Sequence, residues 1–91
     1  MERVHLIITG MVQGVWFRHN TNIIGNKLGL NGFVRNTPEG AVEVIAEGDP
    51  TQLAKLIEFC RKGPASARVE DVKVDYEEAK NEFKGFEIRY D

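Results

Sequence analysis

The chain has little cysteine and no long hydrophobic run. Cys60 is its single cysteine, so no intramolecular disulfide can form, which excludes the disulfide-rich secreted miniproteins. The apolar run Leu6-Ile7-Ile8 is far shorter than the ~20 residues of a membrane-spanning helix, and it is too short for the core of a signal peptide. We therefore expect a cytoplasmic protein that has no membrane partner.

The chain also lacks an excess of positive charge. Its net charge of −2 argues against a general nucleic-acid binder. Residues 1–37 carry four basic side chains and one acidic side chain, whereas the remaining residues carry eight basic and thirteen acidic ones. If an anion binds this protein, we therefore expect it in the first third of the chain.

The 91 residues, 42% hydrophobic and 29% charged, are typical of one globular domain, which we place at residues 1–91. Period-2 alternation of apolar side chains predicts strands near residues 3–9, 33–36, 41–47, 72–76 and 86–90. Pro38 and Gly40 fit the second and fourth positions of a type I turn, so the second and third strands form a hairpin. Residues 77–82 are expected to form a polar connection.

The first of two predicted helices covers residues 19–28. Ile24 and Leu28 are stacked four residues apart on it, and Gly29 is placed to end it. Its helix propensity is poor, because Gly25 and three asparagines are weak helix formers. Such a helix must be held by packing against the rest of the protein.

The second predicted helix has clear start and stop signals. Asp49 is its expected N-cap, Pro50 takes the first helical position, and Gln52 stands where the partner of a capping box belongs. Gly63-Pro64 ends the helix. Its expected buried stripe consists of Leu53, Leu56, Ile57 and Cys60.

This order of elements predicts an α+β protein with the ferredoxin-like split βαβ sandwich. In that fold two helices cover one face of a mostly antiparallel sheet, here of four to five strands. The fold alone does not identify a function, because it occurs in RNA binders, metal carriers, regulatory domains and enzymes.

Most of these functions find no support in the residues. An RNA-recognition domain needs aromatic side chains on its central strands, and residues 41–47 contain none. His5 and His19 have no carboxylate or cysteine at metal-ligand spacing, and Cys60 lies on an apolar stripe, so we predict no metal site. The chain also lacks a P-loop motif and a readable Ser-His-Asp or Cys-His arrangement.

The connection between the first strand and the first helix is the remaining candidate site. Gly10 and Gly14 allow close approach of the backbone to a ligand, and backbone N–H groups of such a connection can form a nest for an anion. Arg18 stands at the helix start, where its planar guanidinium can pair with two phosphate oxygens. The alternative is a loop that binds no ligand, since loops with two glycines are common and a lone arginine usually faces water.

The same segment resembles the signature of a known family. Gly10-x-Val12-Gln13-Gly14-Val15-x-Phe17-Arg18 is similar to the signature of the acylphosphatases, small ferredoxin-like enzymes that hydrolyse acyl phosphates. The resemblance continues through nearly the whole chain in Leu28-Gly29-Leu30-x-Gly32-Phe33-Val34-Arg35-Asn36, Gly40-x-Val42-Glu43, Glu47-Gly48, Gly63-Pro64 with Arg68, and Phe86-x-Ile88-x-Tyr90.

The resemblance implies a site and a reaction. By the resemblance, Arg18 binds the phosphate oxygens and Asn36 holds the attacking water. Side chains alternate along a strand, so Arg35 points to the face opposite Asn36 and is left out of the site. The implied enzyme is a monomer without metal or cofactor, and it converts an acyl phosphate into a carboxylate and inorganic phosphate. The implied phosphate-binding loop consists of Gln13, Gly14, Val15, Trp16, Phe17 and Arg18.

Alternatives remain open at this point. The chain fits a domain that holds a phosphorylated ligand without efficient turnover, or a structural or RNA-binding module. Asn36 by itself reads as a turn residue before Thr37-Pro38. Met11 and Trp16 flank the loop, where they either contact the acyl group or, as we favour, simply pack.

Overall fold

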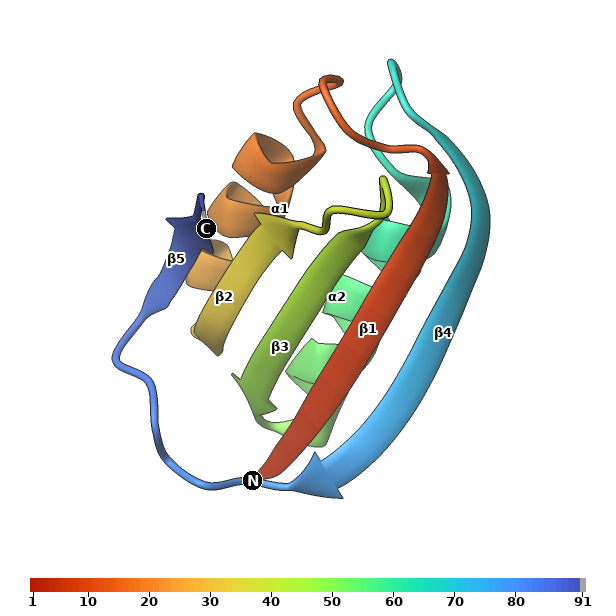
Figure 1. Ribbon diagram of the computed structural model, residues 1–91. Coiled ribbons are helices and arrows are strands. Elements are labelled where there is room, and N and C mark those ends of the chain that lie inside the picture. The colour runs from red at the N-terminus through yellow and green to blue at the C-terminus, as the bar shows by residue number, and fades with distance from the viewer. Residues whose placement is uncertain (91) are drawn as a thin grey trace.

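The computed structural model describes residues 1–90 and contains five strands and two helices (Figure 1). In chain order they are β1 (Glu2–Met11), α1 (Phe17–Lys27), β2 (Asn31–Asn36), β3 (Val42–Gly48), α2 (Pro50–Lys62), β4 (Arg68–Glu78) and β5 (Phe86–Arg89). The predicted order is confirmed. The predicted bounds of the fourth strand are too narrow, because Glu77 and Glu78 continue β4 and the polar connection begins only at residue 79.

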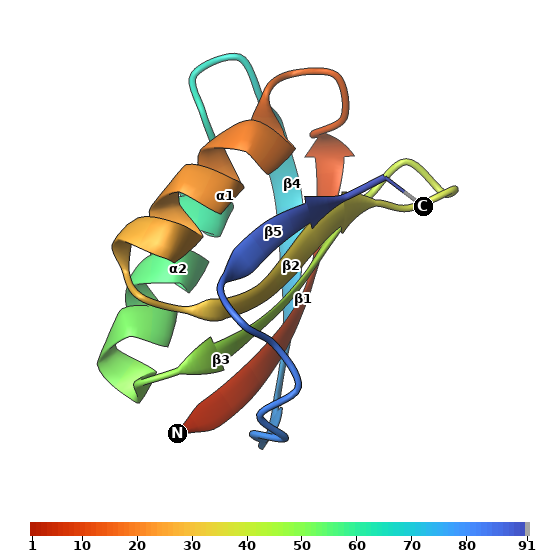
Figure 2. The same cartoon turned by 90° about the vertical axis from the view of Figure 1, so that its left-hand side faces the viewer.

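The strands form one sheet in the order β4-β1-β3-β2-β5. Neighbouring strands are antiparallel except β2 and β5, which run parallel. Both helices lie on one face of the sheet, and the other face is left without helices (Figure 2). This is the expected ferredoxin-like α+β fold, with β5 added beside β2.

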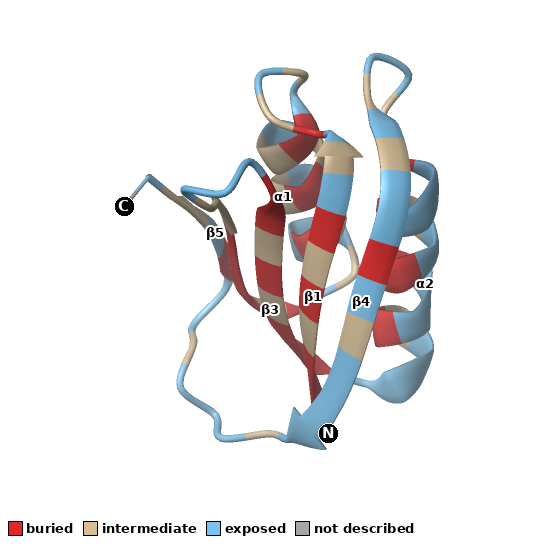
Figure 3. Cartoon of the chain, turned by 45° about the vertical axis from the view of Figure 1, so that its right-hand side comes forward, coloured by how far each residue is buried: buried red, intermediate tan, exposed pale blue. Residues whose placement is uncertain are grey.

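The core lies between the sheet and the helices. Along β1 the side chains of Val4, Leu6 and Ile8 are fully buried and alternate with half-buried ones, as the period-2 pattern predicts (Figure 3). The edge strand β4 is mostly exposed in the same view. Tyr76 of this outer strand is 63% exposed, because it lies near the end of the strand.

Helix α1 differs from its prediction at both its start and its buried face. It begins at Phe17, two residues earlier than predicted, and it buries Phe17, Thr21 and Gly25. Ile24 and Leu28, the predicted stripe, are only partly buried against the core. A Cβ on Gly25 would lie 2.6 Å from the Phe86 ring of β5, so glycine permits close packing of α1 on the sheet.

The asparagines of α1 explain its poor helix propensity. The Asn22 and Asn26 side-chain amides both donate to the carbonyl of Phe86, at 2.8 and 2.9 Å. Asn26 Oδ1 also accepts a hydrogen bond from the Phe86 backbone N–H, at 3.2 Å. These residues are weak helix formers, but their side chains attach α1 to the backbone of the short edge strand β5.

Helix α2 confirms its predicted buried stripe and its end at Gly63, but not its capping box. Asp49 Oδ1 accepts from the backbone N–H of Thr51 at 2.9 Å, and the Oε1 of Gln52 is buried without a hydrogen-bond partner in residues 1–90. Cys60 is fully buried, and burial raises the pKa of its thiol to about 12. It is therefore a core residue, as predicted.

A buried ion pair holds the connection between β4 and β5. Arg3 Nε donates to Glu47 at 2.8 Å, and a second guanidinium nitrogen donates to Glu82 at 2.6 Å. Glu47 also accepts from the backbone N–H groups of Lys80 and Asn81, at 2.7 and 3.0 Å. Glu82, predicted as part of a polar connection, thus fixes that connection against the sheet.

Candidate active site

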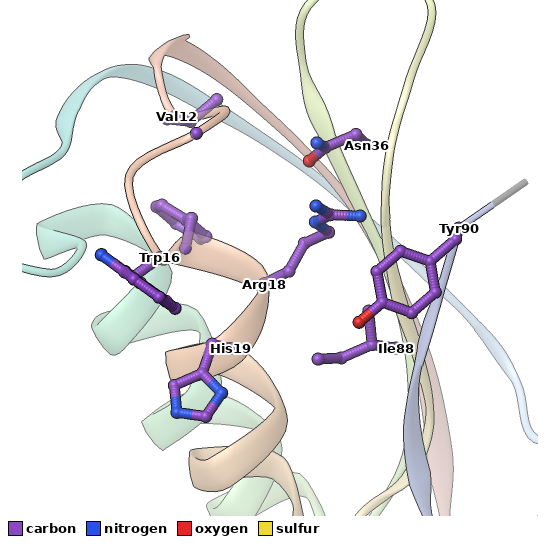
Figure 4. A pocket seen from close by; sticks show the side chains of 9 residues that line it. Val12, Trp16, Arg18, His19, Asn36, Ile88 and Tyr90 are labelled. Carbon is purple, nitrogen blue, oxygen red and sulfur yellow. The ribbon is translucent and has the colours of Figure 1, made fainter.

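A pocket of about 310 Å³ lies between the start of α1, the end of β2 and the chain around β5. Its lining includes Arg18, Asn36, Ile88 and Tyr90, which come from segments far apart in the sequence (Figure 4). The structure therefore brings together Arg18 and Asn36, the two side chains singled out from the sequence.

The connection from β1 to α1 has an unusual backbone. Gly14 and Trp16 both adopt left-handed conformations, with φ of 73° and 64°. Within residues 1–90, the backbone N–H groups of residues 13–18 donate to no acceptor, either in a loop or turn or on a side chain. Free N–H groups in a loop and at a helix start are the groups that bind anions in proteins.

Two side chains hold this connection in place. The Gln13 amide donates to the carbonyls of Thr37 and Ala41, at 2.9 and 2.8 Å. On the other side, the Ser66 hydroxyl donates to the carbonyl of Val15 at 2.8 Å. Gln13 thereby ties the loop to the turn that follows Asn36, so the two halves of the pocket are braced against each other.

Gly10 belongs to the sheet and not to the anion-binding loop. It pairs with Val69 of β4, next to a register shift between Thr9 and Gly10. A Cβ at this position would lie 2.2 Å from the Arg68 carbonyl oxygen. The sequence-based expectation that Gly10 allows the backbone to approach a ligand is therefore wrong, because the close approach is between β1 and β4.

The Arg18 side chain extends into the pocket between Asn36 and Tyr90 (Figure 4). Its guanidinium carbon lies 4.9 Å from the centre of the Tyr90 ring, a cation–π contact. In the part of the chain that the structure describes, no carboxylate forms an ion pair with Arg18. The positive charge of Arg18 is therefore available to an anionic ligand.

Asn36 is the last residue of β2 and lies on the same face of the sheet as the buried Val34. Its Oδ1 atom is buried and has no hydrogen-bond partner within residues 1–90. Leaving a buried acceptor unpaired typically costs about 1–3 kcal/mol. An unpaired acceptor facing the pocket is suited to a hydrogen-bond donor such as water.

Arg35, the neighbour of Asn36, points away from the pocket. Its Nε donates to Glu43 on the face of the sheet that carries no helix, as the alternation of strand side chains predicts. His5 contacts the same carboxylate, with 2.7 Å between its Nε2 and Glu43 Oε2. Leaving Arg35 out of the site is thus consistent with the structure.

Trp16 and Met11 do not pack into the core, contrary to our expectation. Their exposed fractions are 71% and 64%. Trp16 lines the pocket, with its ring 5.9 Å from that of His19 in an edge-to-face arrangement, whereas Met11 is not part of the lining. His19 was not predicted as a pocket residue, because its position depends on a helix that starts earlier than predicted.

No group of three metal-ligating side chains occurs among residues 1–90, and none of the helices there is long and apolar enough to cross a membrane. Fold and pocket together define a class of small split-βαβ proteins with a pocket of mixed polar and apolar lining between the first helix and the end of the second strand. Comparison with known proteins narrows that class to a family.

A family model described as acylphosphatase matches residues 4–88. An acylphosphatase of Trichormus variabilis is 45% identical over 87 residues, which cover 96% of this chain and 85% of that protein. The crystal structure of the acylphosphatase from Bacillus subtilis has a TM-score of 0.95 at 32% identity and covers 99% of this chain and 100% of that one. An acylphosphatase from Coxiella burnetii has a TM-score of 0.89 at 32% identity, with coverages of 97% and 93%. The chain belongs to the acylphosphatase family, whose function is the hydrolysis of acyl phosphates.

Proposed function

We propose that this acylphosphatase uses Arg18, Asn36 and the backbone of residues 13–18 to hydrolyse the carboxyl–phosphate anhydride bond without a metal or cofactor. This assignment rests on the observation that two groups in one pocket each lack a bonding partner in the protein. The Arg18 guanidinium has no carboxylate partner within residues 1–90, and the buried Asn36 Oδ1 has no hydrogen-bond donor there.

The phosphate group occupies the loop. Backbone N–H groups of residues 13–18 and the guanidinium of Arg18 donate to its oxygens and neutralise its charge. In phosphoryl transfer the catalytic effect comes mainly from positioning and from stabilising charge on the transferred group. Gln13 and Ser66 keep the loop in place through their bonds to Thr37, Ala41 and Val15, so the donors are arranged before the substrate binds.

Asn36 orients the attacking water. Its Oδ1 accepts one hydrogen of the water, whose oxygen attacks phosphorus in line with the departing carboxylate. The new P–O bond forms as the bond to the acyl oxygen breaks, and the carboxylate leaves with the bonding electrons. A phosphate oxygen of the substrate takes the proton of the water, so no protein base is required.

We further propose a cytoplasmic monomer whose ligands are a small acyl phosphate and inorganic phosphate, with no nucleic acid or membrane partner. The net charge of −2 and the short apolar runs support this part of the proposal.

The test is release of inorganic phosphate from benzoyl phosphate or carbamoyl phosphate by purified protein in the presence of a chelator. We expect release well above the uncatalysed rate, together with competitive inhibition by inorganic phosphate. Phosphate binding without turnover would instead identify a domain that holds a phosphorylated ligand. If the protein showed no turnover and bound no phosphate, the whole assignment would be overturned.

A further inference from the structure

Trp16 is a large aromatic residue that the fold holds outside the core. It lies at the N-cap of α1 with a left-handed backbone, which is uncommon for any residue but glycine, and it makes no capping hydrogen bond. Its side chain is 71% exposed although it lines the pocket. Neither core packing nor helix capping therefore accounts for a tryptophan here.

The pocket has a polar part and an aromatic part. Asn36 and the Arg18 guanidinium form the polar part, while Trp16 and His19 lie together on the side of Arg18 away from Asn36 (Figure 4). The two rings meet edge to face, with 5.9 Å between their centres and 72° between their planes. This contact orients the indole ring and leaves most of its surface uncovered.

The reaction geometry assigns a role to that side. In an in-line displacement the leaving group departs opposite the attacking water. With water held at Asn36, the acyl group lies beyond the phosphate, on the side of Trp16 and His19. We propose that Trp16 and His19 form an acyl subsite that favours acyl phosphates with an aromatic acyl group. This inference rests on the proposed function.

The chemistry of the subsite explains the preference. An aroyl group is planar and fits the face of an indole, and such ring pairs contribute about 0.5–1.5 kcal/mol beyond the burial of area. Tyr90 is less suited to this role, because the guanidinium of Arg18 lies over its ring. The pocket volume, about 310 Å³, is at the lower end for small-molecule sites, which suits a phosphate with one aromatic ring.

The first experiment compares kcat/KM for benzoyl phosphate and acetyl phosphate. We expect Trp16→Ala to lower the benzoyl-to-acetyl ratio about 2- to 12-fold, the range that corresponds to one aromatic contact. Trp16→Phe keeps an aromatic ring and retains most of the ratio, and His19→Ala lowers the ratio less than Trp16→Ala does. The ratio cancels any general effect of the substitution on the phosphate-binding loop.

Met11→Ala is the matched control, since Met11 is also large, exposed and next to the loop but does not line the pocket. This variant keeps the wild-type ratio. An unchanged ratio in Trp16→Ala, or an equal fall in Met11→Ala, would overturn the subsite. If the wild-type protein turned over neither substrate, that result would instead contradict the proposed function, so the two failures are distinguishable.

A second experiment uses the unmodified protein. Trp16 is the only tryptophan, so all indole fluorescence comes from this position. Titration with phenacylphosphonate, a non-hydrolysable analogue with an aromatic ring, changes the emission more than saturating inorganic phosphate does. Equal changes with both compounds would place the ring of the ligand away from Trp16.

Discussion

Asn36 and Asn31 stand at opposite ends of β2 but differ in how the rest of the protein satisfies their side-chain oxygens. Asn36 ends β2 with a buried, unpaired Oδ1, whereas Asn31 begins the same strand and accepts a hydrogen bond from the Gly85 N–H at 2.8 Å. A buried polar group that pairs with nothing within residues 1–90 reduces stability, and the one on Asn36 belongs to a residue that lines the pocket. The two asparagines of β2 therefore have opposite expected roles.

We expect Asn36→Ala to remove most turnover and to leave competitive inhibition by phosphate nearly unchanged, because water alignment matters only in the transition state. The melting temperature stays the same or rises, since an unpaired buried acceptor is removed. In the control Asn31→Ala, turnover is retained and the melting temperature falls. Measuring kcat, the phosphate inhibition constant and thermal unfolding on each variant checks this. A large loss of phosphate affinity in Asn36→Ala would make Asn36 a phosphate ligand instead.

Arg18 is tested by a substitution that keeps its charge. Arg18→Lys loses the planar fork that binds two oxygens, so we expect weaker phosphate inhibition and a fall in kcat of at least about 10²-fold, as for loss of an oxyanion donor. Arg35→Lys is the control, because Arg35 bonds to Glu43 on the opposite face. Steady-state kinetics on both variants measure the effect, and phosphate inhibition that Arg18→Lys leaves unchanged would contradict the assignment.

At the scale of elements, local signals predicted the order of strands and helices, the hairpin turn and the buried face of α2. They failed where distant segments decide the outcome. The start of α1 depends on the left-handed Trp16, and its buried face depends on Phe86, about 60 positions later in the chain. The poor helix formers could therefore be identified from the sequence, but the contacts that they make with the distant strand could not be predicted.

Gly25 provides a test of this conclusion. Alanine usually stabilises a helix relative to glycine by about 1 kcal/mol. Because its Cβ would meet the Phe86 ring at 2.6 Å, we expect Gly25→Ala to destabilise the protein by about 1–3 kcal/mol instead. Chemical unfolding measures the change. The smaller side chain in Phe86→Leu is expected to offset part of the loss in the double variant, and two additive single effects would show that the two residues are not in conflict.

The candidate site was predictable to the extent that it follows a local motif. The loop and Arg18 were expected from the residues themselves and Asn36 from the family resemblance, and the structure places Arg18 and Asn36 in one pocket. The braces from Gln13 and Ser66, whose partners lie 24 to 51 positions away, were not predictable. The positions of His19 and Tyr90 were also missed, because each depends on where an element begins or ends.

At the scale of the whole molecule, carboxylates on the face without helices connect the strands by forming ion pairs with basic side chains. Burial of the Glu43 carboxyl by itself raises its pKa, but hydrogen bonds and charge from His5 and Arg35 outweigh burial and hold the pKa below the usual 4.5. Glu47 behaves in the same way, since its bonds to Lys80, Arg3 and Asn81 outweigh its burial and lower its pKa. Both carboxylates stabilise the folded protein only while they are charged.

This arrangement fixes the sign of the pH dependence. A carboxyl group whose pKa is lower in the folded than in the unfolded state contributes its full stability above the unfolded pKa, and the contribution is lost as pH falls through the folded pKa. We therefore expect the free energy of unfolding to be steady near neutral pH and to decline below about pH 4.5. Glu43→Gln lowers stability at pH 7 and makes the decline between pH 5 and pH 3 shallower, because one coupled group no longer titrates. Glu58→Gln, on the exposed side of α2, is the matched control. Urea unfolding at several pH values measures these curves, and a Glu43→Gln curve parallel to that of the wild type would show that Glu43 is not coupled to folding.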